Sequence, residues 1–223
     1  MKKIVVVIPA YNASKTLSSV FKRIPKPALR KIYRFIVVND GSSDNTFDVI
    51  KLLGRKYKIK IINHIVNKGY GAAQKSGLRE ALRLKADIMV LLHSDGQHAP
   101  EVLEKLINPI EINKADVVQG SRILGSKSMP SGMPLHRYIG NRILTFLENT
   151  AYGMRMAEYH SGYMLYSKKA LKTIPFEKLS DKFHFDGEML LVAKKRGLRI
   201  KEIPVPTIYA DESSHLNPVK YGF

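Results

Sequence analysis

The sequence predicts an α/β protein in which a mostly parallel central sheet is flanked by helices and followed by a smaller subregion. Short, β-branched apolar runs alternate with stretches of helical periodicity, which is typical of strand–helix–strand units. The runs are apolar throughout, as expected for parallel strands that are buried on both faces. Polar residues directly follow several runs, and open α/β sheets bind ligands at that end of their strands.

The N-terminal half is expected to contain four strands, each followed by a helix. The strands are predicted over residues 4–8, 35–38, 60–62 and 88–92. The helices are predicted over residues 17–24, from about 47 to 53, from the segment 67–73 through Leu82, and over 100–112. Ser14 is a candidate N-cap of the first helix, and Pro25 and Pro27 are expected to end it.

The pattern changes after residues 116–122. Residues 123–135 contain two glycines, three serines and two prolines, which indicates a loop. A loop of this length inside a compact domain is usually functional or mobile. The remaining predictions are a helix over 138–151, a strand over 161–166, a helix over 186–196 closed by Gly197, and a strand over 199–206 before a polar tail.

The composition narrows the choice of partners. The 223 residues are expected to form a single domain with two halves, 1–122 and 123–223. The formal net charge of +18 indicates nucleic acid, an anionic membrane surface or phosphorylated substrates, or else only a well-solvated surface. No nucleic-acid-binding motif is present, so nucleic acid is not the expected partner.

The location of the protein is predicted from what the sequence lacks. No apolar run reaches the roughly 18 residues of a membrane-spanning helix. The first apolar run is too short for a signal peptide, and there is no cysteine. We therefore expect a cytoplasmic protein, with attachment to the cytoplasmic face of a membrane as the alternative. The oligomeric state is left open.

The residues after the strand at 88–92 suit a metal ion. Asp95 and Gln97 are oxygen donors two residues apart, which suits Mg²⁺ or Mn²⁺ held together with substrate phosphates. His93 adds an imidazole, which a transition metal accepts more readily than Mg²⁺ does. The alternative is a polar turn with Asp95 and Gly96 at its corner.

Four motifs carry a family resemblance. They are Ile8-Pro-Ala-Tyr-Asn12, Val38-Asn-Asp-Gly-Ser-Ser-Asp44, Asn67-Lys-Gly-Tyr-Gly71 and Ser94-Asp-Gly-Gln-His98. Each lies at the end of a predicted parallel strand, so all four are expected to face one crevice. Over about Lys3 to Pro206 the chain resembles the family 2 glycosyltransferases of the GT-A fold, especially the dolichyl-phosphate mannose synthases and polyprenyl-phosphate sugar transferases. Four motifs in order are a far stronger signal than one.

The resemblance implies which residues bind the nucleotide sugar. The candidates are Pro9, Tyr11, Val38, Asp40, Lys68, Gly69, His93, Ser94 and Arg122. Tyr11 would stack on the base, and Asp40 would accept hydrogen bonds from the base or ribose. Gly69 would let the backbone approach the nucleotide. The alternatives are a core aromatic for Tyr11, a turn residue for Asp40 and a plain exposed cation for Lys68.

The resemblance also implies a divalent metal, Mn²⁺ or Mg²⁺, that bridges the donor diphosphate. Asp95 matches the second carboxylate of the family's Asp-x-Asp motif, and Gln97 matches a further ligand. His93 stands in place of the first carboxylate, so it either ligates the metal or contacts the donor ribose or phosphate. Arg122 matches an arginine that contacts the diphosphate, to which a guanidinium fork is suited.

In the second half, the resemblance suggests a catalytic base. Glu158 stands three residues before Ser161-Gly162, where relatives carry an aspartate, and Asp186 is a second candidate. The alternatives are a solvated loop carboxylate for Glu158 and a helix cap for Asp186. Met164 replaces an arginine that the family usually has. Residues 123–135 are expected to form a lid over the donor diphosphate.

We therefore expect an inverting glycosyltransferase that moves a sugar from a nucleotide-diphosphate sugar to an acceptor. The expected acceptor is a polyprenyl (dolichyl) phosphate, with basic clusters at an anionic membrane surface. The clusters are Lys22, Arg23, Lys26, Arg30 and Lys31, and then Lys168, Lys169, Lys172, Lys194, Lys195 and Arg196. The alternative is a non-catalytic module that binds nucleotide sugar, with a metal site degenerate at His93.

Overall fold

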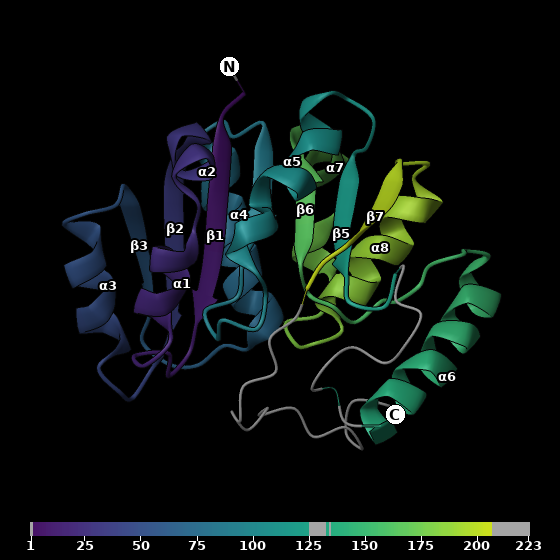
Figure 1. Cartoon of the computed structure of the whole chain (residues 1–223), viewed down its shortest axis with the longest axis horizontal. Coiled ribbons are helices and arrows are strands. Elements are labelled where there is room, and N and C mark those ends of the chain that lie inside the picture. The colour runs from purple at the N-terminus through teal and green to yellow at the C-terminus, as the bar shows by residue number, and fades with distance from the viewer. Residues whose placement is uncertain (1, 125–132, 134, 207–223) are drawn as a thin grey trace.

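A computed structural model describes residues 2–124, 133 and 135–206. The strands are β1 (Ile4–Ala10), β2 (Ile32–Asp40), β3 (Ile59–His64), β4 (Ile88–Leu91), β5 (Val117–Ser121), β6 (Met164–Ser167) and β7 (Ile200–Pro204). They form one sheet in the order β3-β2-β1-β4-β6-β5-β7 (Figure 1). β6 pairs antiparallel with β4 and β5, and the other pairings are parallel. The predicted fold class is confirmed.

Helices cover both faces of the sheet (Figure 1). They are α1 (Leu17–Arg23), α2 (Lys26–Lys31), α3 (Thr46–Gly54), α4 (Tyr70–Arg83), α5 (Leu103–Glu111), α6 (Leu135–Tyr152), α7 (Lys168–Thr173) and α8 (Phe185–Lys195), with short 3-10 turns at Pro100–Val102 and Phe176–Lys178. Among the described residues, none of these helices is long and apolar enough to cross a membrane.

The position of β1 inside the sheet, between β2 and β4, explains its unbroken apolar sequence. Ile4, Val6 and Ile8 belong to the apolar layer formed with α1, α2, α3 and α5. Val5 and Val7 belong to the layer formed with α4, α7 and α8 on the other face. Since successive side chains of a strand point to opposite faces, a strand covered on both sides must be apolar at every position.

Around α1 and α2, the structure differs from the prediction in two places. Residues 26–31 form α2, although Pro27 was expected only to end the helix before it. A proline is tolerated in the first turn of a helix, because the N–H that it lacks has no partner within the helix there. Ser14 is not an N-cap: Thr16 holds that position, and the Ser14 N–H donates to Asp44.

Further along the chain, two elements were not predicted from the sequence, β5 and α7. The sequence of β5 is Val-Val-Gln-Gly-Ser. Its last three residues are not apolar, so the segment lacks the pattern of a buried strand, although all five residues are buried. β6 begins at Met164 and not at Ser161, because Gly162 has a φ of +71° and interrupts the extended chain. In the predicted loop, residues 125–132 and 134 lie outside the described residues, so the lid stays a prediction.

Candidate functional site

The four motifs meet at one edge of the sheet, which we call the crevice edge. β1, β2, β3 and β4 are parallel, so their carboxyl ends all lie there. Because β6 is antiparallel, residues 161–163 in front of it arrive at the same edge, beside the end of β5. Figure 1 shows α6 extending along this side of the molecule.

The first two motifs brace each other. The Asn12 side chain accepts a hydrogen bond from the Ser43 N–H (2.9 Å), and the Asn12 N–H donates to the Ser42 hydroxyl (3.0 Å). Although partial burial works against it, hydrogen bonds from Ser14 and Thr46 lower the pKa of Asp44 to about 2. Tyr11 is held at this rim with 45% of its surface exposed, which excludes a core aromatic and leaves its ring accessible for stacking.

Asp40 is a buried organiser of the third motif. Its carboxylate accepts hydrogen bonds from the N–H groups of Lys68 and Gly69, both at 3.0 Å, and lies 2.6 Å from His64 Nδ1. Both carboxylate oxygens of Asp40 are therefore already hydrogen-bonded within the protein. The predicted hydrogen bond from a base or ribose would have to use a remaining lone pair on one of these two oxygens. The Val38 side chain lies in the core, and any contact that it makes with a nucleotide must come from its backbone.

Gly69 and Gly71 allow a close approach between two backbone segments. Gly69 has a φ of +102°, and a Cβ there would lie 2.7 Å from the carbonyl oxygen of Asp181. The Gly71 N–H donates to that same oxygen at 2.8 Å. The glycines thus let the third motif pack against the loop before α8, and the predicted approach of Gly69 to the nucleotide stays a prediction. Lys68 is exposed beside them.

A hydrogen-bonded chain links His93 to Asp186 at the start of α8. The Tyr70 hydroxyl lies 2.8 Å from His93 Nε2 and donates to Asp186 at 2.6 Å. Burial raises the pKa of the Asp186 carboxyl, although the hydrogen bond from Tyr70 acts in the opposite direction. Asp186 is therefore enclosed beneath Tyr70, and is neither a cap nor a solvated carboxylate.

His98 supports His93 from below. Its ring centroid lies 4.3 Å from that of His93, and it stacks on Tyr163 at 4.7 Å. Burial, with smaller contributions from His93 and Arg122, holds the pKa of the His98 imidazole well below its usual range. Its Nε2 lies 2.6 Å from the carbonyl oxygen of Ser161, so this nitrogen carries the proton. His98 is therefore a neutral platform.

The donor set for a metal is small but chemically suitable. Asp95 is partly exposed at the end of β4, and its Oδ1 accepts the Gln97 N–H at 2.9 Å. Within the described ranges, no group of three or more His, Cys, Asp or Glu side chains is arranged to hold a metal. One carboxylate, the Gln97 amide oxygen and one imidazole nitrogen fit a divalent ion that takes its remaining ligands from phosphate and water. Ser94 is buried beside this set.

Glu158 and Arg122 form a buried ion pair. Glu158 is fully buried, and it accepts hydrogen bonds from the Arg122 N–H and Nε, both at 2.7 Å, and from Nη2. Asn141 of α6 donates to the same carboxylate at 3.3 Å. The predicted base and the predicted diphosphate ligand therefore contact each other. Glu158 is not the solvated loop carboxylate that was the alternative.

Several residues that build this site were not singled out from the sequence. Tyr70, His98, Gly162 and Asn141 act through partners that are distant in the chain, and only Tyr70 and His98 lay within the quoted motifs. A tyrosine or histidine inside a strand-end motif is the one signal that could have drawn attention to them.

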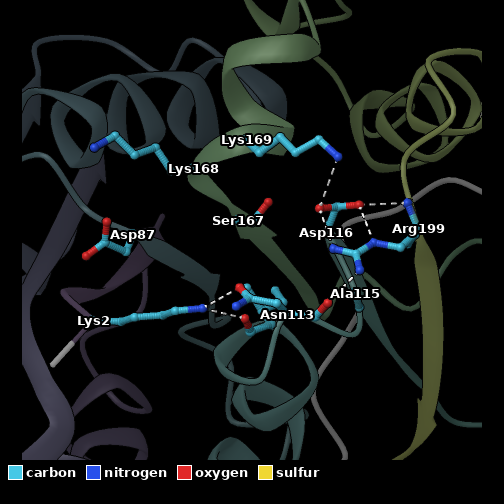
Figure 2. Close-up of a pocket in the computed structure, with 10 residues that line it drawn as sticks. Lys2, Asp87, Asn113, Ala115, Asp116, Ser167, Lys168, Lys169 and Arg199 are labelled. Atoms are coloured by element: carbon cyan, nitrogen blue, oxygen red, sulfur yellow. Dashed lines mark hydrogen bonds and ion pairs between the residues drawn. The ribbon is translucent and has the colours of Figure 1, made fainter.

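A polar pocket lies at the opposite edge of the sheet, away from the crevice edge. Figure 2 shows Asp116 between Lys169 and Arg199, with Lys2 and Asp87 nearby. Arg199 holds Asp116 at 2.9 Å and lowers the pKa of this carboxyl to about 2. The contacts join β5, β7 and α7, so we assign this pocket a structural role.

The chain is similar in sequence and in fold to known glycosyltransferases. A family model described as glycosyl transferase family 2 matches residues 5–174. An uncharacterised protein of Methanocaldococcus jannaschii is 34% identical, over 95% of this chain and 84% of that protein. The UDP-N-acetylglucosamine–dolichyl-phosphate N-acetylglucosaminyltransferase of Methanococcus voltae is 36% identical, over 95% of this chain and 88% of that protein. A solved structure of glucosyl-3-phosphoglycerate synthase from Mycobacterium tuberculosis, in complex with Mn²⁺ and UDP, has a similar fold, with a TM-score of 0.69 at 19% identity over 95% of this chain and 73% of that one.

Proposed function

This chain belongs to glycosyl transferase family 2 and is a glycosyltransferase, and we propose that it transfers a sugar, with inversion, from a nucleoside diphosphate sugar to a polyprenyl phosphate. The name of the Methanococcus voltae relative supports this class of acceptor. Within the molecule, the observation that carries the proposal is an exposed apolar stripe beside the crevice edge.

The stripe lies on the outer face of α6. Leu135, Ile139, Ile143, Phe146 and Leu147 are between 48% and 70% exposed, and their spacing places them on one side of the helix. The inner side is polar and packs next to Arg122: Asn141 donates to Glu158, and Glu148 pairs with His160. A contiguous exposed apolar surface indicates a binding surface. The hydrocarbon chains of a lipid acceptor are apolar, so they could pack on this stripe while the acceptor phosphate reaches the crevice edge.

The basic clusters expected at a membrane are weaker candidates. Arg23 pairs with Glu101, and Lys31 lies 3.1 Å from Glu104. Lys169 lies 3.7 Å from Asp116, at the edge of the sheet opposite the crevice edge. Ion pairing within the protein reduces what these side chains can offer to lipid headgroups. We therefore assign the membrane contact to the α6 stripe.

The donor would lie across the ends of β1, β2 and β4. Tyr11 would stack on the base, and Arg122 would turn toward the diphosphate while Glu158 fixes its guanidinium. Asp95 and Gln97 would hold a divalent ion. When bound, such an ion supplies positive charge to the departing diphosphate.

The acceptor phosphate would attack the anomeric carbon directly. A phosphate oxygen is already ionised at neutral pH, so no base has to remove a proton from it. The new bond forms opposite the departing nucleoside diphosphate, which leaves with the electron pair of the broken bond. Glu158 and Asp186 are both committed to partners, and this agrees with a reaction in which they position other groups.

A transfer assay tests the proposal. The enzyme is incubated with radiolabelled UDP-N-acetylglucosamine, UDP-glucose or GDP-mannose, with and without Mn²⁺, in the presence of polyprenyl phosphate or 3-phosphoglycerate. We expect label in the organic phase with polyprenyl phosphate and Mn²⁺. Transfer to 3-phosphoglycerate alone would contradict the lipid acceptor. Nucleotide binding without transfer or hydrolysis would instead favour a non-catalytic module.

A further inference from the structure

We propose that Tyr70 and Asp186 fix the tautomer of His93, so that His93 Nδ1 offers its lone pair to the divalent ion at Asp95 and Gln97. The inference deepens the proposed function and rests on it only for the presence of that ion. It also gives Asp186 a different task from the catalytic base that the sequence suggested.

The direction of the hydrogen bonds follows from counting protons. A tyrosine hydroxyl has one proton, and Tyr70 uses it to donate to Asp186 at 2.6 Å. The Tyr70 oxygen can then only accept from His93 Nε2, at 2.8 Å. Nε2 of His93 must therefore carry the proton. In neutral imidazole the other nitrogen, Nδ1, is then unprotonated.

Three contacts hold the His93 ring in place. A Cβ on Gly162 would lie 2.6 Å from His93 Cε1, so only glycine lets the ring lie against this backbone. The neutral ring of His98 packs on another side, at 4.3 Å between centroids. Tyr70 closes the third side and is itself stacked on Phe183 at 5.2 Å. These contacts restrict the His93 ring to one orientation.

With Nε2 protonated and bound to Tyr70, Nδ1 of His93 can act as a metal ligand. Among the described residues, Tyr70 is the one hydrogen-bond partner of its ring. An unprotonated Nδ1 cannot donate to a phosphate oxygen, but it can bind a metal, and it favours Mn²⁺ over Mg²⁺. A ligating histidine usually donates its other ring N–H to an outer-shell partner, and loss of such a partner typically lowers metal affinity about 10–100-fold.

The tautomer can be measured in the metal-free protein. Long-range ¹H–¹⁵N correlation spectra at mildly alkaline pH distinguish a protonated ring nitrogen from an unprotonated one, and His93→Asn identifies the His93 signals. We expect Nε2–H in the wild type and a loss of this preference in Tyr70→Phe. Tyr57→Phe is the matched control, because it removes a hydroxyl remote from the site, and its spectrum should retain the wild-type His93 signals. A wild-type Nδ1–H tautomer, or no change in Tyr70→Phe, would overturn the proposal.

The metal contact has its own measurement. Electron spin-echo envelope modulation of Mn²⁺ bound with UDP reports a directly coordinated nitrogen. We expect an imidazole coupling in the wild type and in Tyr57→Phe, its loss in His93→Asn, and about 10–100-fold weaker Mn²⁺ binding in Tyr70→Phe. Bound Mn²⁺ without a nitrogen coupling would defeat the ligand role of His93.

Neither measurement requires turnover. If the nitrogen coupling is present but no sugar reaches polyprenyl phosphate, the proposed function fails and this inference stands. If transfer occurs and the coupling is absent, the inference fails and the proposed function stands.

Discussion

At the scale of single residues, Glu158 shows how a partner decides what a carboxylate does. A base must reach the acceptor, but Glu158 is fully buried and bound to Arg122 through several hydrogen bonds. The desolvation of such a pair is offset only while both charges remain. Its geometry therefore favours a role in holding Arg122.

Glu158→Gln should separate the two roles. The change leaves the Arg122 guanidinium without its counter-charge, and we expect a loss of up to about 3 kcal/mol in the free energy of unfolding. The KM for the donor should rise, and kcat should change less. Urea denaturation and steady-state kinetics provide the comparison. Wild-type stability together with an abolished kcat would instead identify Glu158 as the base.

Tyr11 is the residue whose exposed ring is available to the nucleotide. Tyr11→Ala should weaken binding of the nucleoside diphosphate by about 1–3 kcal/mol, the usual contribution of base stacking. Isothermal titration calorimetry with UDP and Mn²⁺ measures this loss. Tyr33→Ala removes a similarly exposed tyrosine at the start of β2 and serves as the control. Equal dissociation constants for all three proteins would rule out stacking by Tyr11.

At the scale of elements, α6 combines two surfaces with different tasks. Asn141 and Glu148 connect it to the Arg122 side of the crevice edge, while its apolar stripe faces away from the protein. A helix with one apolar and one polar face can lie in a membrane interface without spanning the bilayer. The helix would thus bring the crevice edge to the lipid acceptor.

Phe146→Glu should detach the enzyme from lipid. Phe146 is 70% exposed on α6, and burying such a side chain in lipid contributes about 1.5–3 kcal/mol, so binding should weaken at least about tenfold. Sedimentation with anionic phospholipid vesicles measures the change. Leu52→Glu, at a 61% exposed position on α3, carries the same charge change and should bind like the wild type. Undiminished sedimentation of Phe146→Glu would exclude the α6 stripe as the contact.

At the scale of the whole molecule, the ion pair at the edge opposite the crevice edge makes a pH-dependent contribution to the free energy of unfolding. Arg199 of the segment before β7 binds Asp116 in front of β5 and lowers its pKa from 3.8 to about 2. Because the folded-state pKa is lower than the unfolded one, the contribution is complete above about pH 4 and disappears as the pH falls through about 2.

Asp116→Asn should remove this contribution. We expect the variant to be less stable than the wild type at neutral pH by at most about 1 kcal/mol, because solvent screens the half-exposed Arg199. The difference should shrink as the pH falls from about 4 toward 2. Urea unfolding across this pH range measures it. A constant difference at every pH would show that packing, and not ionisation, is responsible.

The sequence was sufficient to predict the layers of the fold and the edge of the sheet at which the four motifs meet. The apolar runs of β1, β2 and β4 identify strands that are covered on both faces, because that pattern is local and continuous. Since parallel strands end at one edge, the motifs that follow them had to share it. β5 escaped prediction because half of it is polar, and it is a strand only through its pairing with β6 and β7.

The tertiary structure alone decided which side chains are partners. Tyr70 and Asp186 are 116 positions apart, and Arg122 and Glu158 are 36 apart, so no local pattern joins them. Their pairing depends on how α8 and α6 pack at the crevice edge. In the folded chain the two candidate bases, Asp186 and Glu158, accept hydrogen bonds from Tyr70 and Arg122. The apolar face of α6 is likewise visible only in the fold, because a helical stripe becomes a surface only when no other element covers it.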